Sequence, residues 1–253
     1  MRPIALVTGA TSGFGKAIAE TFAQHGYDII ITGRREERLN SLKDQLESNA
    51  GCEVLTLCFD VRDQDVTLQT LSNLPDRWQN VEVLVNNAGL ASGMDTIQDG
   101  DLEDWNRMID TNVKGLLYVS KAILPGMTKR GKGHVINIGS TAGKEVYSKG
   151  NVYCASKHAV DAITKGMRID TLGTGVKVTQ IAPGAAETEF SEVRFHGDKD
   201  KAKSVYNGYQ PMTAEDIASV TYYVTTLPPH LCINDLVLTS LSQANSFYIH
   251  REN

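Results

Sequence analysis

Seven apolar runs of strand length recur along the chain, and stretches of helical character separate them. Several runs are rich in β-branched residues and apolar throughout, as expected of parallel strands that crossover helices cover on both faces. The runs span residues 4–8, 27–32, 53–59, 81–85, 134–138, 176–182 and 235–241. Strands that alternate with helices in this way predict an α/β fold, a doubly wound parallel sheet of about seven strands.

The chain is predicted to form a single domain, residues 1–253, because it contains no internal repeat, low-complexity tract or linker. Counting glycine, about half of the residues are apolar, as in globular proteins. The formal charge of −5 argues against nucleic acid or an anionic membrane as a partner. The first apolar run is too short for a signal peptide, and no run approaches the roughly 18 residues of a membrane span. We therefore expect a cytoplasmic protein.

Cysteine and histidine spacing gives no sign of a metal site. The four cysteines (Cys52, Cys58, Cys154 and Cys232) include no Cys-x-x-Cys pair and do not cluster with the six histidines. No metal and no disulfide framework are expected, and each cysteine is predicted to be a small buried apolar residue.

Two segments near the end of the chain depart from the alternation of strands and helices. Residues 185–212 are polar and lack sustained helix or strand periodicity. A segment of that length in a compact domain is usually functional or disordered, and we predict a substrate lid. Residues 242–253 form a polar tail with two aromatic residues, which would be mobile in a monomer unless something holds it. A partner subunit is one surface on which the tail could pack.

A glycine-rich turn, TGATSGFG at positions 8–15, follows the first strand and leads directly into a helix. Gly9 allows the tight turn, Gly13 lets the backbone approach a pyrophosphate, and Gly15 lets the helix pack against the strand. The helix N-terminus would then offer its free N–H groups to phosphate oxygens. The turn predicts a dinucleotide site of the Rossmann type, and the alternative is a glycine-rich turn that binds nothing.

The residues after the second strand indicate which dinucleotide is bound. NAD-binding sites place an acidic residue about 20 positions after the turn, where it holds the ribose 2′-hydroxyl. Here the strand ends in Gly33-Arg34-Arg35, and arginine fits the 2′-phosphate of NADP(H) instead. Alternatively, both arginines form a solvated helix start beside Glu36 and Glu37, although cations at that end oppose the helix dipole. We expect NADP(H).

A serine at the end of a strand is followed closely by a tyrosine and a lysine. Ser140 stands at the carboxyl end of the strand at 134–138, the edge at which open α/β sheets bind ligands. Tyr153 and Lys157 are four residues apart, so a helix places them on one face. An ammonium about 4 Å away at an effective dielectric of about 20 contributes roughly 4 kcal/mol, which would bring the pKa of Tyr153 from about 10 towards ~7. Such a tyrosine could exchange a proton near neutral pH, as the reduction of a carbonyl by hydride requires.

Together these motifs resemble those of the short-chain dehydrogenase/reductase family. The spacing Gly-x-x-x-Gly-x-Gly, the NNAG sequence at 86–89, the upstream serine, the Tyr-x-x-x-Lys pair and a later Pro-Gly…Thr segment occur in the family's order, and the resemblance extends from Ile4 to about Leu241. It implies that Ser140 hydrogen-bonds the substrate oxygen and that Lys157 also binds the nicotinamide ribose. It further implies a fourth catalytic residue, Asn112, which holds a helix distortion and a water.

The resemblance also implies the cofactor-binding residues. Asp60 would accept a hydrogen bond from the adenine amino group, or else cap the end of its strand. Thr188 and the backbone of Pro183-Gly184 would hold the nicotinamide carboxamide. The expected set is Thr8, Gly9, Thr11, Ser12, Gly13, Phe14, Gly15, Arg34, Arg35, Asp60, Val61, Asn87, Ala88, Gly89, Tyr153, Lys157, Pro183, Gly184 and Thr188.

Substrate-binding candidates come from the lid and from the segment around the catalytic tyrosine. An arginine beside an aromatic residue, as at Arg194-Phe195, suits a small molecule with a carboxylate or sulfonate. Alternatively, Arg194 pairs with Glu192 or with a neighbouring subunit. The expected substrate-binding residues are Ser140, Tyr147, Asn151, Tyr153 and Arg194.

Several segments, among them TGRREERL, VLVNNAGLASGM and SEVRF, resemble two bacterial groups of the family. These are the sulfoacetaldehyde reductases and the NADP-dependent 3-hydroxy acid dehydrogenases of the serine/allo-threonine type. The resemblance favours reduction of sulfoacetaldehyde to isethionate, with oxidation of 3-hydroxypropionate, serine or allo-threonine as the alternative. A non-catalytic NADP-binding regulator is a third possibility, against which Ser140, Tyr153 and Lys157 argue. The family also implies a homo-tetramer or dimer.

Overall fold

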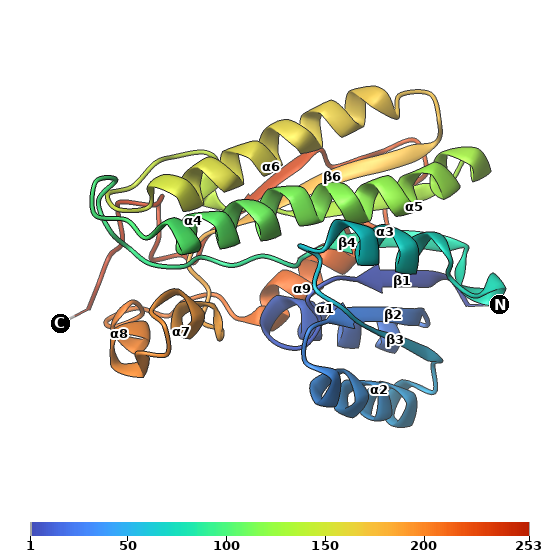
Figure 1. The fold of residues 1–253 in the computed structure, drawn as a ribbon, viewed down its shortest axis with the longest axis horizontal. Helices are drawn as coiled ribbons and strands as arrows, with labels where there is room; N and C mark the ends of the chain where they lie inside the picture. The colour runs from blue at the N-terminus through green and yellow to red at the C-terminus, as the bar shows by residue number, and fades with distance from the viewer. Residues whose placement is uncertain (1, 253) are drawn as a thin grey trace.

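Seven parallel strands form one sheet in a computed structural model that describes residues 2–252 (Figure 1). Their order across the sheet is β3-β2-β1-β4-β5-β6-β7. The strands are β1 (Ile4–Val7), β2 (Asp28–Gly33), β3 (Val54–Cys58), β4 (Val81–Asn86), β5 (Gly133–Ile138), β6 (Val176–Pro183) and β7 (Asp235–Leu238). The order reverses between β1 and β4, and open α/β sheets bind ligands beside the carboxyl ends of the strands at such a switch point. The predicted fold class is confirmed.

Helices cover both faces of the sheet (Figure 1). One face carries α1 (Gly13–Gln24), α2 (Glu36–Ala50) and α9 (Ala214–Tyr223), and the other carries α3 (Gln64–Ser72), α4 (Leu102–Ile109), α5 (Leu116–Arg130) and α6 (Asn151–Asp170). A π-helical turn, Asp110–Gly115, joins α4 to α5. None of the described helices is long and apolar enough to cross a bilayer.

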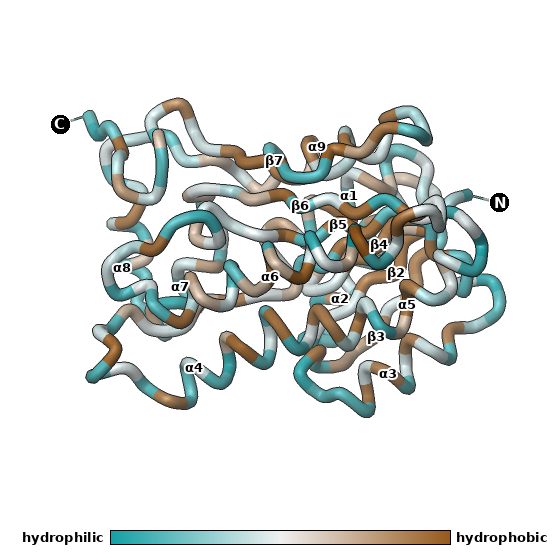
Figure 2. The backbone as a smooth tube through the Cα atoms, turned by 90° about the horizontal axis from the view of Figure 1, so that it is seen from above, coloured by the Kyte–Doolittle hydropathy of each residue, from teal (hydrophilic) through white to brown (hydrophobic). Residues whose placement is uncertain are grey.

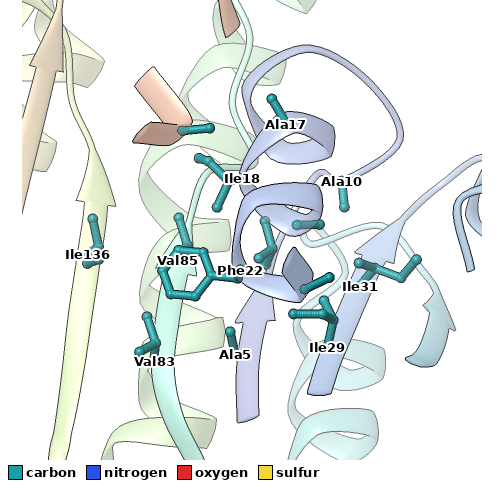
Figure 3. Close-up of a cluster of buried hydrophobic side chains, with 14 of the residues drawn as sticks. Ala5, Ala10, Ala17, Ile18, Phe22, Ile29, Ile31, Val83, Val85 and Ile136 are labelled. Atoms are coloured by element: carbon teal, nitrogen blue, oxygen red, sulfur yellow. The ribbon is translucent and has the colours of Figure 1, made fainter. Parts of the chain in front are cut away.

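The core lies in two layers because successive strand residues point to opposite faces of the sheet. Ala5 of β1 packs in the layer under α1, whereas its neighbour Leu6 packs in the layer under α5. Figure 3 shows Ile18 and Phe22 of α1 lying over β1 and β4, and both side chains are fully buried. The hydrophobic stretches of the chain gather accordingly in the central strands (Figure 2). This packing fixes the carboxyl ends of the strands as a rigid edge.

The predicted lid segment contains two short helices, α7 (Phe190–Arg194) and α8 (Lys199–Ser204). Helices of five and six residues are too short to show an apolar period, which explains why the sequence shows no sustained periodicity here. A polar cap stabilises α8, since the Asp198 side chain accepts a hydrogen bond from the Lys201 backbone N–H at 3.0 Å. The base of the segment is closed by a bond of 2.9 Å from the Glu187 N–H to the Met212 carbonyl.

The C-terminal tail lies against its own chain, at the same end of the molecule as α7 and α8 (Figure 1). The Gln243 side chain accepts a hydrogen bond of 2.9 Å from the Ala185 N–H. Arg251 donates to the Val205 carbonyl at 3.0 Å. Both partners belong to the lid segment, so the tail and the lid form one connected surface.

The cysteines differ in their surroundings. Cys52 and Cys154 are buried, Cys232 is half-buried and Cys58 is exposed. The prediction of a buried residue is therefore wrong at Cys58, because this residue ends β3, the strand at the edge of the sheet.

Candidate active site

A cavity of about 640 Å³ opens where the strands end, and most of the predicted site residues line it. The predicted residues on its wall include Gly9, Thr11, Ser12, Gly13, Phe14, Arg34, Arg35, Asp60, Val61, Asn87, Ala88, Gly89, Ser140, Tyr147, Tyr153, Lys157, Pro183, Gly184, Thr188 and Arg194. Four predicted residues are not on the wall: Thr8, Gly15, Asn112 and Asn151. The structure thus brings together residues separated by more than 180 positions.

Thr8 and Gly15 shape the glycine-rich turn from behind the cavity. The Thr8 hydroxyl accepts hydrogen bonds of 3.0 Å from the backbone N–H groups of Asn87 and Ala88, which ties the turn to the end of β4. A Cβ atom on Gly15 would lie 2.4 Å from the Gly9 carbonyl oxygen, so only glycine fits there. Gly9 and Gly13 have positive φ angles of 67° and 51°. The resulting bare backbone at the start of α1 fits a pyrophosphate.

Guanidinium groups surround the start of α2 at the far end of the cavity. Arg35 donates to the hydroxyls of Thr11 at 2.7 Å and Ser12 at 2.8 Å. Sequence analysis missed Glu189, which pairs with Arg35 at 3.1 Å and with Arg38 at 2.7 Å. These contacts join residues more than 150 positions apart, for which no local signal exists. Hydroxyls and guanidinium groups at one end of a dinucleotide-sized cavity fit the 2′-phosphate of NADP(H).

Asp60 lines the cavity and also stabilises the end of its strand. Its carboxylate accepts from the Arg62 backbone N–H at 3.0 Å and from the Arg62 side chain at 2.7 Å, and it lies 3.7 Å from Arg34. Burial alone would raise the pKa of Asp60, but the bonds and charges of Arg62 and Arg34 outweigh burial and hold that pKa below its usual range. The ionised carboxylate therefore acts as a strand-end cap, and its place on the wall also allows the adenine contact.

Tyr153 and Lys157 lie one turn apart on α6 and face Ser140, which follows β5. Tyr153 is 8% exposed and Lys157 is 7% exposed. The Lys157 ammonium donates to the Ile138 carbonyl at 3.0 Å and lies 6.0 Å from the centroid of the Tyr153 ring. The Ser140 hydroxyl accepts from the Ala142 N–H at 3.1 Å.

The protonation states of these two residues follow from burial. Burial raises the pKa of Tyr153, and this effect exceeds the lowering by a hydrogen bond with Ser140 and by the charge of Arg194. Our expectation of a pKa near 7 is thus wrong for the protein alone, because the phenol is desolvated and the ammonium of Lys157 lies beside a carbonyl. Burial also lowers the pKa of Lys157 to about 8. Tyr153 is therefore a protonated phenol at neutral pH, the state that donates a proton.

Asn112 lies in the π-helical turn between α4 and α5, where a helix distortion was predicted. Its side chain accepts from the Leu90 N–H and donates to the Leu90 carbonyl, both at 2.8 Å, and also donates to the Ser156 hydroxyl at 3.0 Å. These bonds connect the loop after β4 to α6. Asn112 is 2% exposed and supports α6 from behind the cavity wall.

Arg194, whose side chain has hydrogen-bond donors without a partner among the described residues, lies beside Tyr153. Arg194 donates to the Tyr147 hydroxyl at 2.9 Å, and its guanidinium carbon lies 5.7 Å from the centroid of the Tyr153 ring. The buried Nε and Nη2 atoms of Arg194 have no hydrogen-bond partner among the residues that the structure describes. Buried donors of this kind are costly unless a ligand satisfies them.

Asn151 lies outside the main cavity. Its side-chain amide donates to the Asp95 carbonyl at 2.9 Å and its oxygen accepts from the Val152 N–H at 2.6 Å. These two bonds hold the start of α6. By contrast, the tail residues Gln243, Ser246 and Arg251 line the cavity, although sequence analysis did not predict this.

The chain is a member of the short-chain dehydrogenase family, since the family model described as short chain dehydrogenase matches residues 3–199. It is accordingly an oxidoreductase. The NADP-dependent 3-hydroxy acid dehydrogenase YdfG of Salmonella typhi is 48% identical over 242 residues, which cover 95% of this chain and 96% of the relative. Sulfoacetaldehyde reductase 2 of Chromohalobacter salexigens is 45% identical over 254 residues, which cover both chains completely.

A solved structure of similar shape supports the same assignment. The closed form of serine dehydrogenase in complex with NADP⁺ superposes with a TM-score of 0.92 at 47% identity, covering 98% of this chain and 100% of that chain. The family resemblance inferred from the motifs is therefore confirmed.

Proposed function

We propose that this chain is an NADPH-dependent reductase of a short aldehyde with an anionic head group, and that it also catalyses the reverse oxidation of the alcohol. Sulfoacetaldehyde, reduced to isethionate, is the first candidate substrate. The second is a 3-hydroxy acid such as 3-hydroxypropionate, serine or allo-threonine, which the similarity to YdfG and to the NADP⁺ complex of serine dehydrogenase supports. Identities of 45% and 48% do not separate the two candidates.

The unpaired donors of Arg194 carry this proposal. Two parallel N–H groups match two oxygens of a carboxylate or a sulfonate. The alternative of an ion pair with Glu192 has no support, because no carboxylate lies within 4 Å of Arg194 in the described part of the chain. An anion bound there would place a carbonyl one or two carbons away beside Tyr153. Ser140, Tyr153 and Lys157 all lie on the cavity wall, which argues against a non-catalytic regulator.

The residues of the chain then divide the chemistry among them. The cofactor, when bound, supplies the hydride to the carbonyl carbon. Ser140 and Tyr153 hydrogen-bond the carbonyl oxygen, and the protonated phenol of Tyr153 gives its proton to that oxygen as the C–H bond forms. The Lys157 ammonium stabilises the phenolate that remains. Arg194 holds the anionic head and thereby orients the carbonyl towards Tyr153.

NADP(H) is the cofactor that the arginines at the start of α2 support. Arg34 and Arg35 line one end of the cavity, where Arg34 lies beside the carboxylate of Asp60 and Arg35 beside that of Glu189. The similarity to NADP-dependent relatives agrees with this choice.

A steady-state comparison tests the proposal. Sulfoacetaldehyde and malonate semialdehyde are compared with NADPH, and uncharged propanal serves as the control. We expect Arg194→Ala to raise the KM of the anionic aldehydes about 10- to 100-fold, because each hydrogen bond to a charged group contributes roughly 1.5–3 kcal/mol. The kcat/KM of propanal should change less than about twofold. Tyr153→Phe, which lacks the proposed proton donor, serves as the inactive control. Unchanged KM values in Arg194→Ala would rule out the anion site.

We also infer a homo-tetramer or dimer in the cytoplasm. The edge strand β7 and the segment directly after it expose the apolar side chains of Val237 and Leu241. Exposed apolar groups beside an unpaired strand edge are a frequent subunit interface.

A further inference from the structure

Arg194 ends α7, a helix of only five residues, so the position of its side chain depends on what holds the end of this helix. The backbone there forms a Schellman motif. The Gly197 N–H donates to the Glu192 carbonyl at 2.8 Å, and the His196 N–H donates to the Val193 carbonyl at 3.3 Å. His196 occupies the left-handed position of the motif with φ 53°, where glycine is the favoured residue.

The His196 side chain contacts a buried carboxylate. Its imidazole Nε2 lies 3.1 Å from Oδ2 of Asp104 on α4. The other oxygen of Asp104 accepts from the Ser92 hydroxyl at 2.6 Å. The Asp104 side chain is 10% exposed. Histidine is less favourable than glycine in this left-handed conformation, but its side chain makes a specific contact with Asp104. Strained backbone conformations that the surrounding structure maintains are found at functional sites.

The loop after β4 makes a second connection to the same point. The Gly93 N–H donates to the Arg194 carbonyl at 3.0 Å. A Cβ atom on Gly93 would lie 2.7 Å from Oδ2 of Asp104, and Gly93 has φ 71°. Three segments therefore meet here: the loop at 92–93, helix α4 and the end of α7.

The junction holds the end of α7 without using the donors of Arg194. Both oxygens of the buried Asp104 carboxylate are bonded, one to Ser92 and the other to His196. The Nε and Nη2 atoms of Arg194 have no partner among the described residues, and Arg194 lines the cavity.

We propose that His196 and Asp104 are positioning residues for Arg194: the Ser92–Asp104–His196 chain fixes the end of α7 and so aims the guanidinium at the anionic head of the substrate. This inference rests on the proposed function of Arg194. It assigns substrate selectivity to residues that are not on the cavity wall.

The variant His196→Gly separates positioning from a structural role. Glycine suits the left-handed position better than histidine, so the helix cap is kept or improved while the link to Asp104 is lost. We expect the KM of malonate semialdehyde or sulfoacetaldehyde to rise about 5- to 20-fold, with the kcat/KM of propanal within about twofold of the parent. The urea midpoint should be unchanged or higher. A merely structural role for His196 would leave the ratio of anionic to neutral substrate unchanged.

A second variant and a double variant complete the test. Asp104→Asn keeps the side-chain volume and the bond to Ser92 but removes the charge that holds His196, and we expect a KM increase in the same direction. In the Arg194→Ala background, His196→Gly should add no further KM increase. If Arg194→Ala raises the KM of the anionic substrates but neither His196→Gly nor Asp104→Asn does, the positioning role is overturned and the proposed function stands. If Arg194→Ala itself has no effect, the proposed anion site fails first.

Discussion

Lys157 is a cation with almost no access to water, and among the described residues its ammonium donates only to the Ile138 carbonyl, at 3.0 Å. Burial lowers its pKa to about 8 from the ordinary 10.5. One pKa unit corresponds to about 1.4 kcal/mol, so the folded protein carries a cost of roughly 3 kcal/mol for this charge at neutral pH. A buried lysine that lowers stability in this way agrees with the catalytic role proposed for Lys157.

The sign of the pH effect follows from proton binding. Below pH 8 both the folded and the unfolded states hold the proton, and the full cost is present. Between pH 8 and about 10.5 the unfolded state binds more protons at this site, so the contribution of Lys157 to the free energy of unfolding rises with pH.

Replacing Lys157 by methionine should remove this cost. We expect Lys157→Met to be inactive but more stable than the parent at pH 7, by about 1–3 kcal/mol, because methionine fills the space without a charge. The difference should shrink as the pH rises towards 10. Urea unfolding at pH 7 and pH 9.5 measures it, and other titrating groups cancel between the two proteins. A difference that does not change with pH would contradict the buried charge.

Residue types were predictable from the sequence where their spacing is local. Tyr153 and Lys157 are one helical turn apart, and the structure places both on α6 facing the cavity. The pKa of Tyr153 was not predictable, because it depends on burial by residues distant in the chain. One of them is Phe190, whose ring centroid lies 5.7 Å from that of Tyr153.

At the scale of elements, three parts of the fold meet at the start of α2. These are the end of β2, the glycine-rich turn at Thr11 and Ser12, and Glu189 of the lid segment. Arg35 is the N-cap residue of α2, and its side chain makes no capping bond. It reaches instead to Thr11 and Ser12 of the glycine-rich turn. A cation at the N-terminus of a helix is unfavourable for the helix dipole, and a phosphate between this helix and α1 would offset that cost.

The double variant Arg34→Ala/Arg35→Ala should lose NADPH affinity far more than NADH affinity. We expect the Kd of NADPH to rise about 10- to 100-fold, since charged hydrogen bonds to the 2′-phosphate are lost, and the Kd of NADH to change less than about threefold. Arg38→Ala is a matched control, because Arg38 bonds Glu189 nearby but does not line the cavity. Cofactor fluorescence titration measures the affinity of the parent and of each variant for NADPH and for NADH. Equal losses for NADPH and NADH in the double variant would contradict the 2′-phosphate contact.

Helices and strands could be located from the sequence where their pattern of apolar residues is strong. The seven strands show continuous apolar runs, and the helix α1 shows Ile18 and Phe22 on one face, so both could be located from the sequence. Helices α7 and α8 could not, because five or six residues contain no full apolar period. Their positions depend on contacts such as His196 with Asp104, which are 92 residues apart.

At the scale of the whole molecule, the chain has a net charge of −5, but several basic side chains line its cavity. Arg34, Arg35, Lys157, Arg194 and Arg251 all line it, so an acidic protein presents a cationic site to its anionic ligands. The last of these arginines belongs to the tail, whose contacts with the lid could not be deduced from sequence, since they join residues 40 or more positions apart.

Removing the tail after Leu241 should loosen the substrate end of this cavity. The tail contributes the bond from Ala185 to Gln243 at 2.9 Å and the bond from Arg251 to Val205 at 3.0 Å, and Arg251 also stacks over Tyr209 at 5.0 Å. These contacts lie within one chain. We therefore expect the truncated protein to keep its particle mass in light scattering while the KM of the anionic aldehyde rises at least about fivefold and proteolysis within residues 195–210 becomes faster.

The milder variant Arg251→Ala should produce the same changes to a smaller extent, because it removes the Val205 and Tyr209 contacts but keeps Gln243. A fall in particle mass together with unchanged proteolysis of the lid would show that the tail joins subunits and does not hold the lid of its own chain.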